Sequence, residues 1–175
     1  MSTFDAALLV LRLGIGLIFA VHGAQKLFGW WKGPGFAGWQ GAMSHMGFRP
    51  ARLFAGISAL AEFAGGLGLA LGLLTPFAAI ALVVVMLNAI ITVHWQKGFF
   101  VTAGGYEYNL TIIAIATGVS AIGPGTDSLD NALGIAGSLS GEWWAPIVLV
   151  VAAVISVATT TLGREHSVLT GHPVS

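Results

Sequence analysis

The chain has 175 residues, of which 56% are hydrophobic and only 8% are charged, and its formal net charge is zero. Soluble globular domains carry about 25% charged residues, so this composition excludes a water-covered globular surface and predicts an integral membrane protein. The lack of a basic run argues against a nucleic-acid partner, and the absence of cysteine excludes disulfides and thiol chemistry by this chain.

A transmembrane helix needs about 20 mainly apolar residues, and on this basis the sequence predicts an all-α, polytopic transmembrane helix bundle. No Lys or Arg precedes the first apolar run, so we expect a retained helix and not a cleaved signal peptide. The last run carries no charge, which is typical of a helix that only packs against others. Five windows qualify as spans: roughly 6–29, 51–74, 76–97, 107–123 and 144–163.

The segment between the first two windows has a mixed pattern. Apolar residues at spacings of three and four predict a short amphipathic helix lying in the membrane interface. Glycines weaken any helix there, so a plain loop stays open as the alternative. The apolar residues are Phe36, Trp39, Met43 and Met46, and the glycines are Gly35, Gly38, Gly41 and Gly47.

Small residues recur four positions apart within the spans. Gly16 and Ala20 stand in the first, and Ala64, Gly68 and Gly72 in the second. In lipid, small residues at this spacing let helix backbones approach closely. We therefore expect these positions to serve helix packing and not ligand binding.

Lysine and arginine fall on one side of the bundle if all five spans form. The positive-inside rule then places the N-terminus outside and the C-terminus in the cytoplasm. The cations are Lys26, Lys32, Arg49, Arg52, Lys97 and Arg164, and the acids of the opposite side are Asp5, Asp127, Asp130 and Glu142.

The first span carries polar residues on one helical face, where Arg12, His22 and Lys26 lie within about 80° of one another. Facing lipid would leave them unsatisfied, so this face should look into the bundle. Glu62 is the only acid near the middle of a span. Counted from the cytoplasmic helix ends, Glu62 is about 16 Å deep and Arg12 about 21 Å deep. These depths predict an Arg12–Glu62 pair, either a structural lock or a charge site.

A second group of polar residues lies nearer the cytoplasmic ends of the spans. We expect His22, Lys26, Asn88 and Glu107 to line a vestibule there. Ideal helical geometry turns His94 about 120° away from Asn88 and points Asn109 nearly opposite Glu107. These two residues therefore fit the vestibule less well.

Histidines near a vestibule have three possible roles. A histidine can donate to a quinone carbonyl and titrates near neutral pH, which suits quinone or proton chemistry. It can equally form a structural hydrogen bond between helices. No H-x-x-x-H or E-x-x-H pairing exists, so no metal site is expected.

Three motifs together resemble the DoxX family of small bacterial membrane proteins. They are LRLGIGLIFAVHGAQKLFGW, AEFAGGLGLALGLLTPFAA and GGYEYNL, and the resemblance spans about residues 5–125. It implies similarity to the membrane subunit of a thiosulfate:quinone oxidoreductase, which passes electrons from thiosulfate to quinone. Actinobacterial relatives are linked to a membrane complex with superoxide dismutase and a sulfurtransferase. The family motifs mark Arg12, His22, Gly23, Lys26, Glu62, Gly105, Tyr106 and Glu107.

The resemblance implies a four-helix DoxX-like core over residues 1–125. Residues 126–143 would form an outer polar connection containing a brief helix, and residues 144–175 a fifth transmembrane helix with a short cytoplasmic tail. The expected location is the bacterial cell membrane.

The expected function is that of a quinone-linked oxidoreductase subunit in sulfur or thiol redox balance or oxidative stress, with quinone as the only candidate cofactor. A non-catalytic scaffold for soluble redox enzymes at the cytoplasmic face, and a small weak-acid transporter, remain alternatives. The candidate catalytic residues are Glu62, His22 and Glu107, and the candidate substrate-binding residues are Arg12, Lys26, Asn88 and Tyr106.

Overall fold

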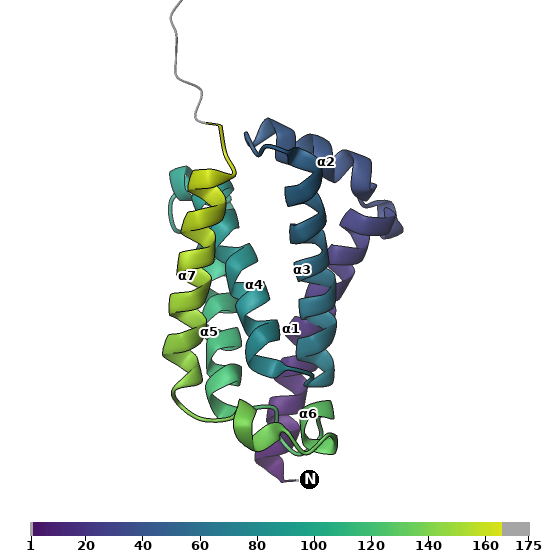
Figure 1. The fold of residues 1–175 in the computed structure, drawn as a ribbon, viewed down its shortest axis with the longest axis vertical. Coiled ribbons are helices and arrows are strands. Elements are labelled where there is room, and N and C mark those ends of the chain that lie inside the picture. The colour runs from purple at the N-terminus through teal and green to yellow at the C-terminus, as the bar shows by residue number, and fades with distance from the viewer. Residues whose placement is uncertain (1, 166–175) are drawn as a thin grey trace, which may run out of the picture.

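The computed structural model describes residues 2–165, which form a bundle of long helices closed at each end by shorter elements (Figure 1). The long helices alternate in direction along the chain. Helix α2 lies across one end of the bundle, and α6 and the N-terminus lie at the other. The α-helices are α1 (Thr3–Phe28), α2 (Gly35–His45), α3 (Ala51–Leu71), α4 (Thr75–Ala89), α5 (Glu107–Ile122), α6 (Leu129–Ala132) and α7 (Trp144–Leu162).

Short helical turns connect or extend these helices. Helix α4 continues through a π-helical turn, η2 (Ile90–His94), and a 3-10 turn, η3 (Trp95–Lys97). The other 3-10 turns are η1 (Trp30–Lys32), η4 (Val101–Ala103) and η5 (Ala136–Leu139).

The prediction of an all-α, polytopic bundle is confirmed. Within residues 2–165, four helices are long and apolar enough to cross a membrane, namely α1, α3, the continuous segment Thr75–Lys97, and α7. Helix α5 is apolar but has only 16 residues, or about 24 Å against the roughly 30 Å of a hydrocarbon core. The predicted fourth span is therefore shorter than the other four.

Helices α1 and α3 pack at backbone distance because glycines face each other across the contact. A Cβ built at Gly66 would lie 2.5 Å from the Ala20 N and 2.6 Å from the Gly16 O, closer than real atoms approach. A Cβ at Gly16 would lie 2.5 Å from the Ala70 N. The packing predicted for Gly16 and Ala20 is confirmed, and it fixes the register of the two helices.

This register decides which residues of α1 and α3 lie at the same level. Gly23 faces Phe63 and Gly16 faces Ala70 in the antiparallel pair. When this register is continued in both directions, Arg12 lies level with the end of α3 and Lys26 lies near Leu60. The first two turns of α3 consequently project beyond the end of α1, where α2 covers them.

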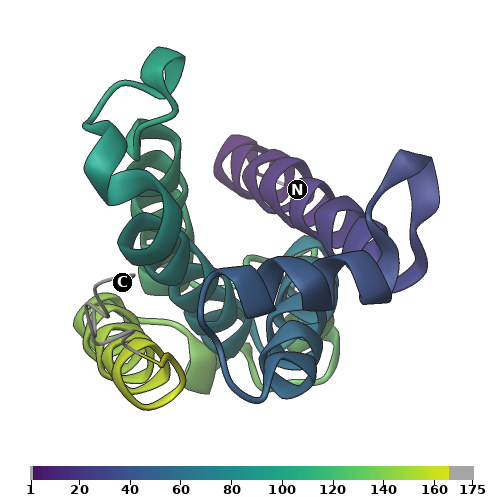
Figure 2. The ribbon, with the colours of Figure 1, turned by 90° about the horizontal axis from the view of Figure 1, so that it is seen from above.

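Helix α2 forms where the sequence allowed either a helix or a loop, so the helix prediction is confirmed. It crosses the end of the bundle and packs against both α3 and α1 (Figure 2). Met43 and Phe48 are buried there with Ala55 in a small apolar cluster. The face predicted to rest on the membrane interface therefore packs largely on protein.

The connection between α5 and α7 forms a folded cap at the opposite end. Asp130, which is fully buried, accepts hydrogen bonds from the Leu74 N at 2.7 Å, the Thr75 N at 3.0 Å and the Thr75 Oγ1 at 2.9 Å. The Leu74 and Thr75 N–H groups are backbone donors at the start of α4, which a helix cannot satisfy internally. The brief helix predicted in this connection is confirmed as α6.

Large apolar side chains cover the outside of the long helices. Such residues would be unfavourable in water, and lipid is the solvent that accepts them. This surface, with the four long apolar helices, makes the chain an integral membrane protein with several spans. Exposed examples are Val10, Leu17, Leu60, Phe77, Val150, Val154 and Val157.

Candidate functional site

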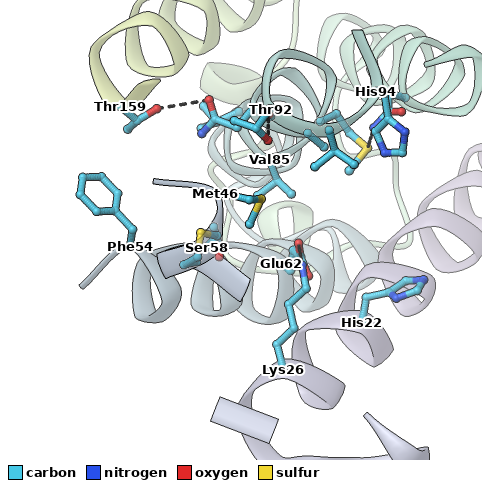
Figure 3. A pocket seen from close by; sticks show the side chains of 18 of the residues that line it. His22, Lys26, Met46, Phe54, Ser58, Glu62, Val85, Thr92, His94 and Thr159 are labelled. Carbon is cyan, nitrogen blue, oxygen red and sulfur yellow. Dashed lines mark hydrogen bonds and ion pairs between the residues drawn. The ribbon is translucent and has the colours of Figure 1, made fainter. Parts of the chain in front are cut away.

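A cavity of about 390 Å³ lies inside the half of the bundle that α2 covers (Figure 3). Small-molecule sites typically measure about 300–1,000 Å³, so the space suits a compact organic ligand. Its walls are mostly apolar side chains from α1, α2, α3, α4 and α7. The polar residues that line it are His22, Lys26, Ser58, Glu62, Asn88, Thr92, His94, Asn109 and Thr159.

The polar centre of this pocket is an ion pair between Lys26 of α1 and Glu62 of α3. Lys26 Nζ donates to Glu62 Oε1. Glu62 is 3% exposed, and its second oxygen, Oε2, is buried with no hydrogen-bond partner. A buried carboxylate oxygen without a donor is costly, so this atom is a natural acceptor for a bound molecule.

Arg12 does not pair with Glu62, and that prediction is wrong. Its Nη1 donates to the Pro124 O and its Nη2 to the Asp127 O at 2.5 Å, in the cap at the far end of the bundle. The helix register and the length of α5 explain the difference. The α1–α3 register puts Arg12 level with the end of α3, and the short α5 lets residues 124–127 reach that level. Arg12 is a structural lock, as one alternative held, but with backbone carbonyls as its acceptors.

Helix α2 supplies an aromatic wall beside the ion pair. Lys26 Nζ lies 4.0 Å from the centre of the Trp39 ring, within the range of a cation–π interaction. Trp39 Nε1 donates to Ser58 Oγ at 2.8 Å, which fixes the orientation of the indole. Lys26 is thus held between a carboxylate and an aromatic ring.

The opposite wall comes from α4 and α7. Thr159 Oγ1 donates to Asn88 Oδ1 at 3.2 Å, and Thr92 Oγ1 donates to the Asn88 O at 2.7 Å. These contacts bring α7 into the pocket, where Ile155 also lines the wall. The description of the last span as a packing helix only is therefore incomplete.

His94 and Asn109 line the pocket, although ideal helical geometry predicted that their side chains would point away from it. His94 ends the π-helical turn η2, whose wider ring changes the direction of the side chains that follow it. Its Nδ1 is 2.6 Å from the Gly104 O, which can only accept, so Nδ1 carries a proton and donates to this carbonyl. Asn109 is 3% exposed, and its Nδ2 lies 3.3 Å from Met86 Sδ.

Glu107 and Tyr106 do not line the pocket and instead organise the loop before α5. Glu107 Oε2 accepts from the Val101 N at 3.0 Å. The Tyr106 ring stacks on Trp95 with centroids 5.7 Å apart and meets Phe99 edge-on at 5.8 Å. The vestibule predicted from His22, Lys26, Asn88 and Glu107 therefore forms without Glu107.

No group of three His, Cys, Asp or Glu side chains is close enough to hold a metal ion within residues 2–165. The residues just described thus offer hydrogen-bond donors, acceptors and an aromatic face.

Comparison with protein families identifies this architecture. The DoxX family model matches residues 7–95, about half of the chain. The chain belongs to the DoxX family. The match runs from α1 through η2 and so includes Lys26, Glu62, Asn88 and His94. The part of this DoxX chain that contributes Asn109, Ile155 and Thr159 lies beyond it. No curated protein and no solved structure matches the chain.

Sequence reasoning missed several pocket residues of this DoxX protein. Trp39 and Ser58 were not singled out as site residues, and neither were Ile155 and Thr159. The apolar spacing of α2 identified Trp39 but suggested the membrane interface as its surroundings. No local pattern marks Thr159, because its partner, Asn88, is distant in the sequence.

Proposed function

We propose that this DoxX protein binds a quinone in the pocket and acts as the membrane subunit of a quinone-linked oxidoreductase in sulfur or thiol redox balance. The observation that carries the proposal is Glu62 Oε2, a buried acceptor without a donor in a mainly apolar cavity. A quinol hydroxyl supplies the missing donor, and the apolar walls accept the ring. Trp39 offers an aromatic face against which a planar ring stacks.

The charge of the pocket favours an uncharged ligand. Lys26 is the only lysine or arginine that lines it among residues 2–165, and Glu62 neutralises that charge. Arg12 stands fourteen residues earlier on α1, or about 21 Å away, and points to the cap. An anion such as thiosulfate would therefore find no free cation in this pocket. In this proposal Arg12 has no substrate-binding role.

The polar residues around the cavity have distinct roles in the proposal. Glu62 accepts a proton from the quinol or returns one to the quinone. Lys26 donates to the ligand oxygen next to Glu62, and His22 or Asn88 donates to the other ring oxygen. Glu107 and Tyr106 act indirectly, since they hold the loop whose Gly104 carbonyl orients His94. Glu107, half-buried at the start of α5, is also placed to exchange protons with water.

Reduction of the quinone to quinol takes two electrons and two protons. We assign the electrons to a reduced sulfur compound held by a soluble partner protein at the cytoplasmic face. Two thiosulfate ions joined through a new S–S bond release two electrons, and so does a dithiol that closes to a disulfide with loss of two protons. Because the chain has no cysteine, the sulfur chemistry belongs to the substrate or to the partner.

The proposed orientation in the bacterial cell membrane puts the α2 end in the cytoplasm. The sequence positions of Lys32, Arg49, Arg52, Lys97 and Arg164 all fall at helix ends on that side, whereas Asp127 and Asp130 belong to the cap. The positive-inside rule supports this assignment and leaves the N-terminus outside. The pocket then lies in the cytoplasmic half of the bundle. The end of the predicted cytoplasmic tail, residues 166–175, lies outside the described residues.

Quinone binding to the purified protein is the test. We expect the wild type to bind a short-chain quinol and Glu62→Gln to bind it at least about tenfold more weakly, since the quinol hydroxyl donates to the carboxylate and the neutral amide is a weaker acceptor. Ser140→Ala, in the cap and away from the pocket, is the control and should bind normally. A dithiol protein, or thiosulfate together with the soluble partner that holds it, should then reduce bound quinone.

Two other results would redirect the assignment. A wild-type protein that binds no quinone but co-purifies with a soluble redox enzyme would contradict the proposal and favour a scaffold. Uptake of a weak acid into proteoliposomes without quinone binding would favour a transporter. The transporter alternative has less support, because the residues that line the pocket all belong to the α2 half of the bundle.

A further inference from the structure

Helices α3 and α7 form two edges of the pocket without belonging to the same packed pair. Helix α3 packs mainly on α1, α4 and α2, whereas α7 packs on α4 and α5. The pocket lies between them and is lined by Phe54 and Ile57 of α3 and by Ile155 and Thr159 of α7. The cavity therefore has one side formed by two helices that are not closely packed on each other.

A backbone bridge closes the cytoplasmic edge of this side. The Arg49 N donates to the Gly163 O at 2.8 Å, and the Glu165 N donates to the Gly47 O at 2.9 Å. Arg164 Nε adds a bond to the Met46 O at 2.9 Å. We call this contact between residues 46–49 and 163–165 the terminal bridge. It ties the end of α7 to the start of α3 and covers the pocket from the water side.

Below the terminal bridge, the side chains at the pocket edge are apolar and face the lipid. Ile57 is 52% exposed and Ile155 is 37% exposed, although both line the cavity. Ile57 also lines a shallow groove on the outside of α3, together with Phe36, Leu53 and Leu60. An apolar path thus leads from the cavity past Ile57 to the outer surface of the bundle.

We propose that the pocket opens sideways into the bilayer between α3 and α7, and that its ligand is a lipid-dissolved quinone with a long apolar chain. The ring binds beside Lys26 and Glu62, and the chain leaves between Ile57 and Ile155 along the outer groove. The terminal bridge keeps the chain from leaving toward water, where its exposure is unfavourable. This inference rests on the proposed quinone site for the identity of the ring.

The test compares two ligands with the same ring, a quinone bearing a decyl chain and one bearing only methyl groups. Ile57→Trp and Ile155→Trp fill the exit, and we expect each to weaken binding of the decyl quinone at least about tenfold while the methyl quinone binds within about twofold of wild type. The matched control is Val154→Trp, next to Ile155 but 64% exposed and outside the pocket lining. It should bind both ligands normally.

A second variant covers the case in which a tryptophan disturbs folding. Ile155→Ala widens the exit and should speed association of the decyl quinone, with no change for the methyl quinone. Unchanged decyl-quinone binding in both tryptophan variants, or equal loss of the two ligands, would overturn the sideways exit, and so would an unchanged association rate in Ile155→Ala. A wild type that binds neither ligand would instead refute the quinone site.

Discussion

The two ends of the bundle each bury a cation of α1, but they treat it differently. At the cap, Arg12 is 1% exposed and gives its guanidinium to two backbone carbonyls. At the α2 end, the Lys26 side chain is 19% exposed and pairs with Glu62 beside a cavity. One cation joins segments of the chain to each other, whereas the other belongs to a polar site with room for a ligand.

The difference lies in what surrounds the unsatisfied atoms. Arg12 Nε and Glu62 Oε2 are both buried without partners, but only Glu62 lines the pocket. An isolated buried polar atom in packed surroundings only lowers stability, while one at a cavity wall can bind a ligand. We therefore expect substitutions at the cap to act on folding and substitutions at the ion pair to act on binding.

The largest effect on stability should come from Arg12→Leu. It leaves the Pro124 and Asp127 carbonyls without donors, and two charge-assisted hydrogen bonds together contribute about 3 kcal/mol or more. Unfolding in sodium dodecyl sulfate should begin at much lower detergent fraction than in wild type. Arg12→Lys, which keeps the charge but reaches fewer acceptors, should be intermediate. A stable Arg12→Leu protein that has lost quinone binding would contradict this account, because it would place ligand binding at the cap.

The next largest effect should come from Gly66→Val, which disturbs the register that keeps the two sites apart. The new side chain overlaps the backbone of Gly16 and Ala20, and overpacking of this kind costs about 1–3 kcal/mol. The same detergent titration measures the loss. The matched control is Gly118→Ala on α5, where no atom lies within 4 Å of an added Cβ. Equal stability of the two variants would show that the α1–α3 contact does not require glycine.

Substitution of the ion pair should separate stability from binding. Glu62→Gln removes the charge partner of Lys26, but the long lysine side chain can turn toward the interface. We therefore expect a loss of only about 1–2 kcal/mol, with at least about tenfold weaker quinol binding. Lys26→Met alone leaves a buried, unpaired carboxylate and should be less stable. The double variant should recover stability relative to Lys26→Met, without recovering binding. Strictly additive losses of stability would mean that the two residues are not coupled.

The smallest effect should come from Thr159→Val, which removes one neutral hydroxyl donor, shared between Asn88 Oδ1 and the Ser156 O, and keeps the shape of the side chain. A bond of this kind contributes about 0.5–1.5 kcal/mol. We expect a small loss of stability and a change in quinone affinity of no more than about threefold. Thr161→Val, two residues further along α7 and outside the pocket lining, serves for comparison. A tenfold loss of affinity in Thr159→Val would move the centre of the site from the ion pair to α7.

Local sequence patterns predicted the elements of this fold but not the partners of its buried charges. Apolar windows located the long helices, and the spacing of apolar residues located α2. The depth of Arg12 and Glu62 was counted from helix ends taken to lie at one level. The contact of Gly16 with Gly66 and Ala70 instead shifts α3 along α1. Such a register depends on packing between distant residues, so it cannot be counted along one helix.

The site, like the fold, was predicted only in part from the sequence. Lys26, His22 and Asn88 were expected near one another because each is a polar residue toward the same end of an apolar span, and all three line the pocket. His94 was predicted to point away from the pocket because no sequence pattern indicates the π-helical turn that ends at this residue. Glu107 was included although it stands at the start of α5 and binds the preceding loop, whose closure depends on several backbone hydrogen bonds.

Photoaffinity labelling with an azido-quinone tests the central claim most directly, because it reports where the ring binds. In the wild type, mass spectrometry should find the label on peptides of α2, α3 and α4 that contain Trp39, Glu62 or Asn88. Excess unlabelled quinone should suppress it, and Glu62→Gln should suppress labelling by the reduced, quinol form of the probe. Label confined to the cap around Arg12, or spread over the lipid-facing surface and insensitive to competitor, would contradict a quinone site at the Lys26–Glu62 pair.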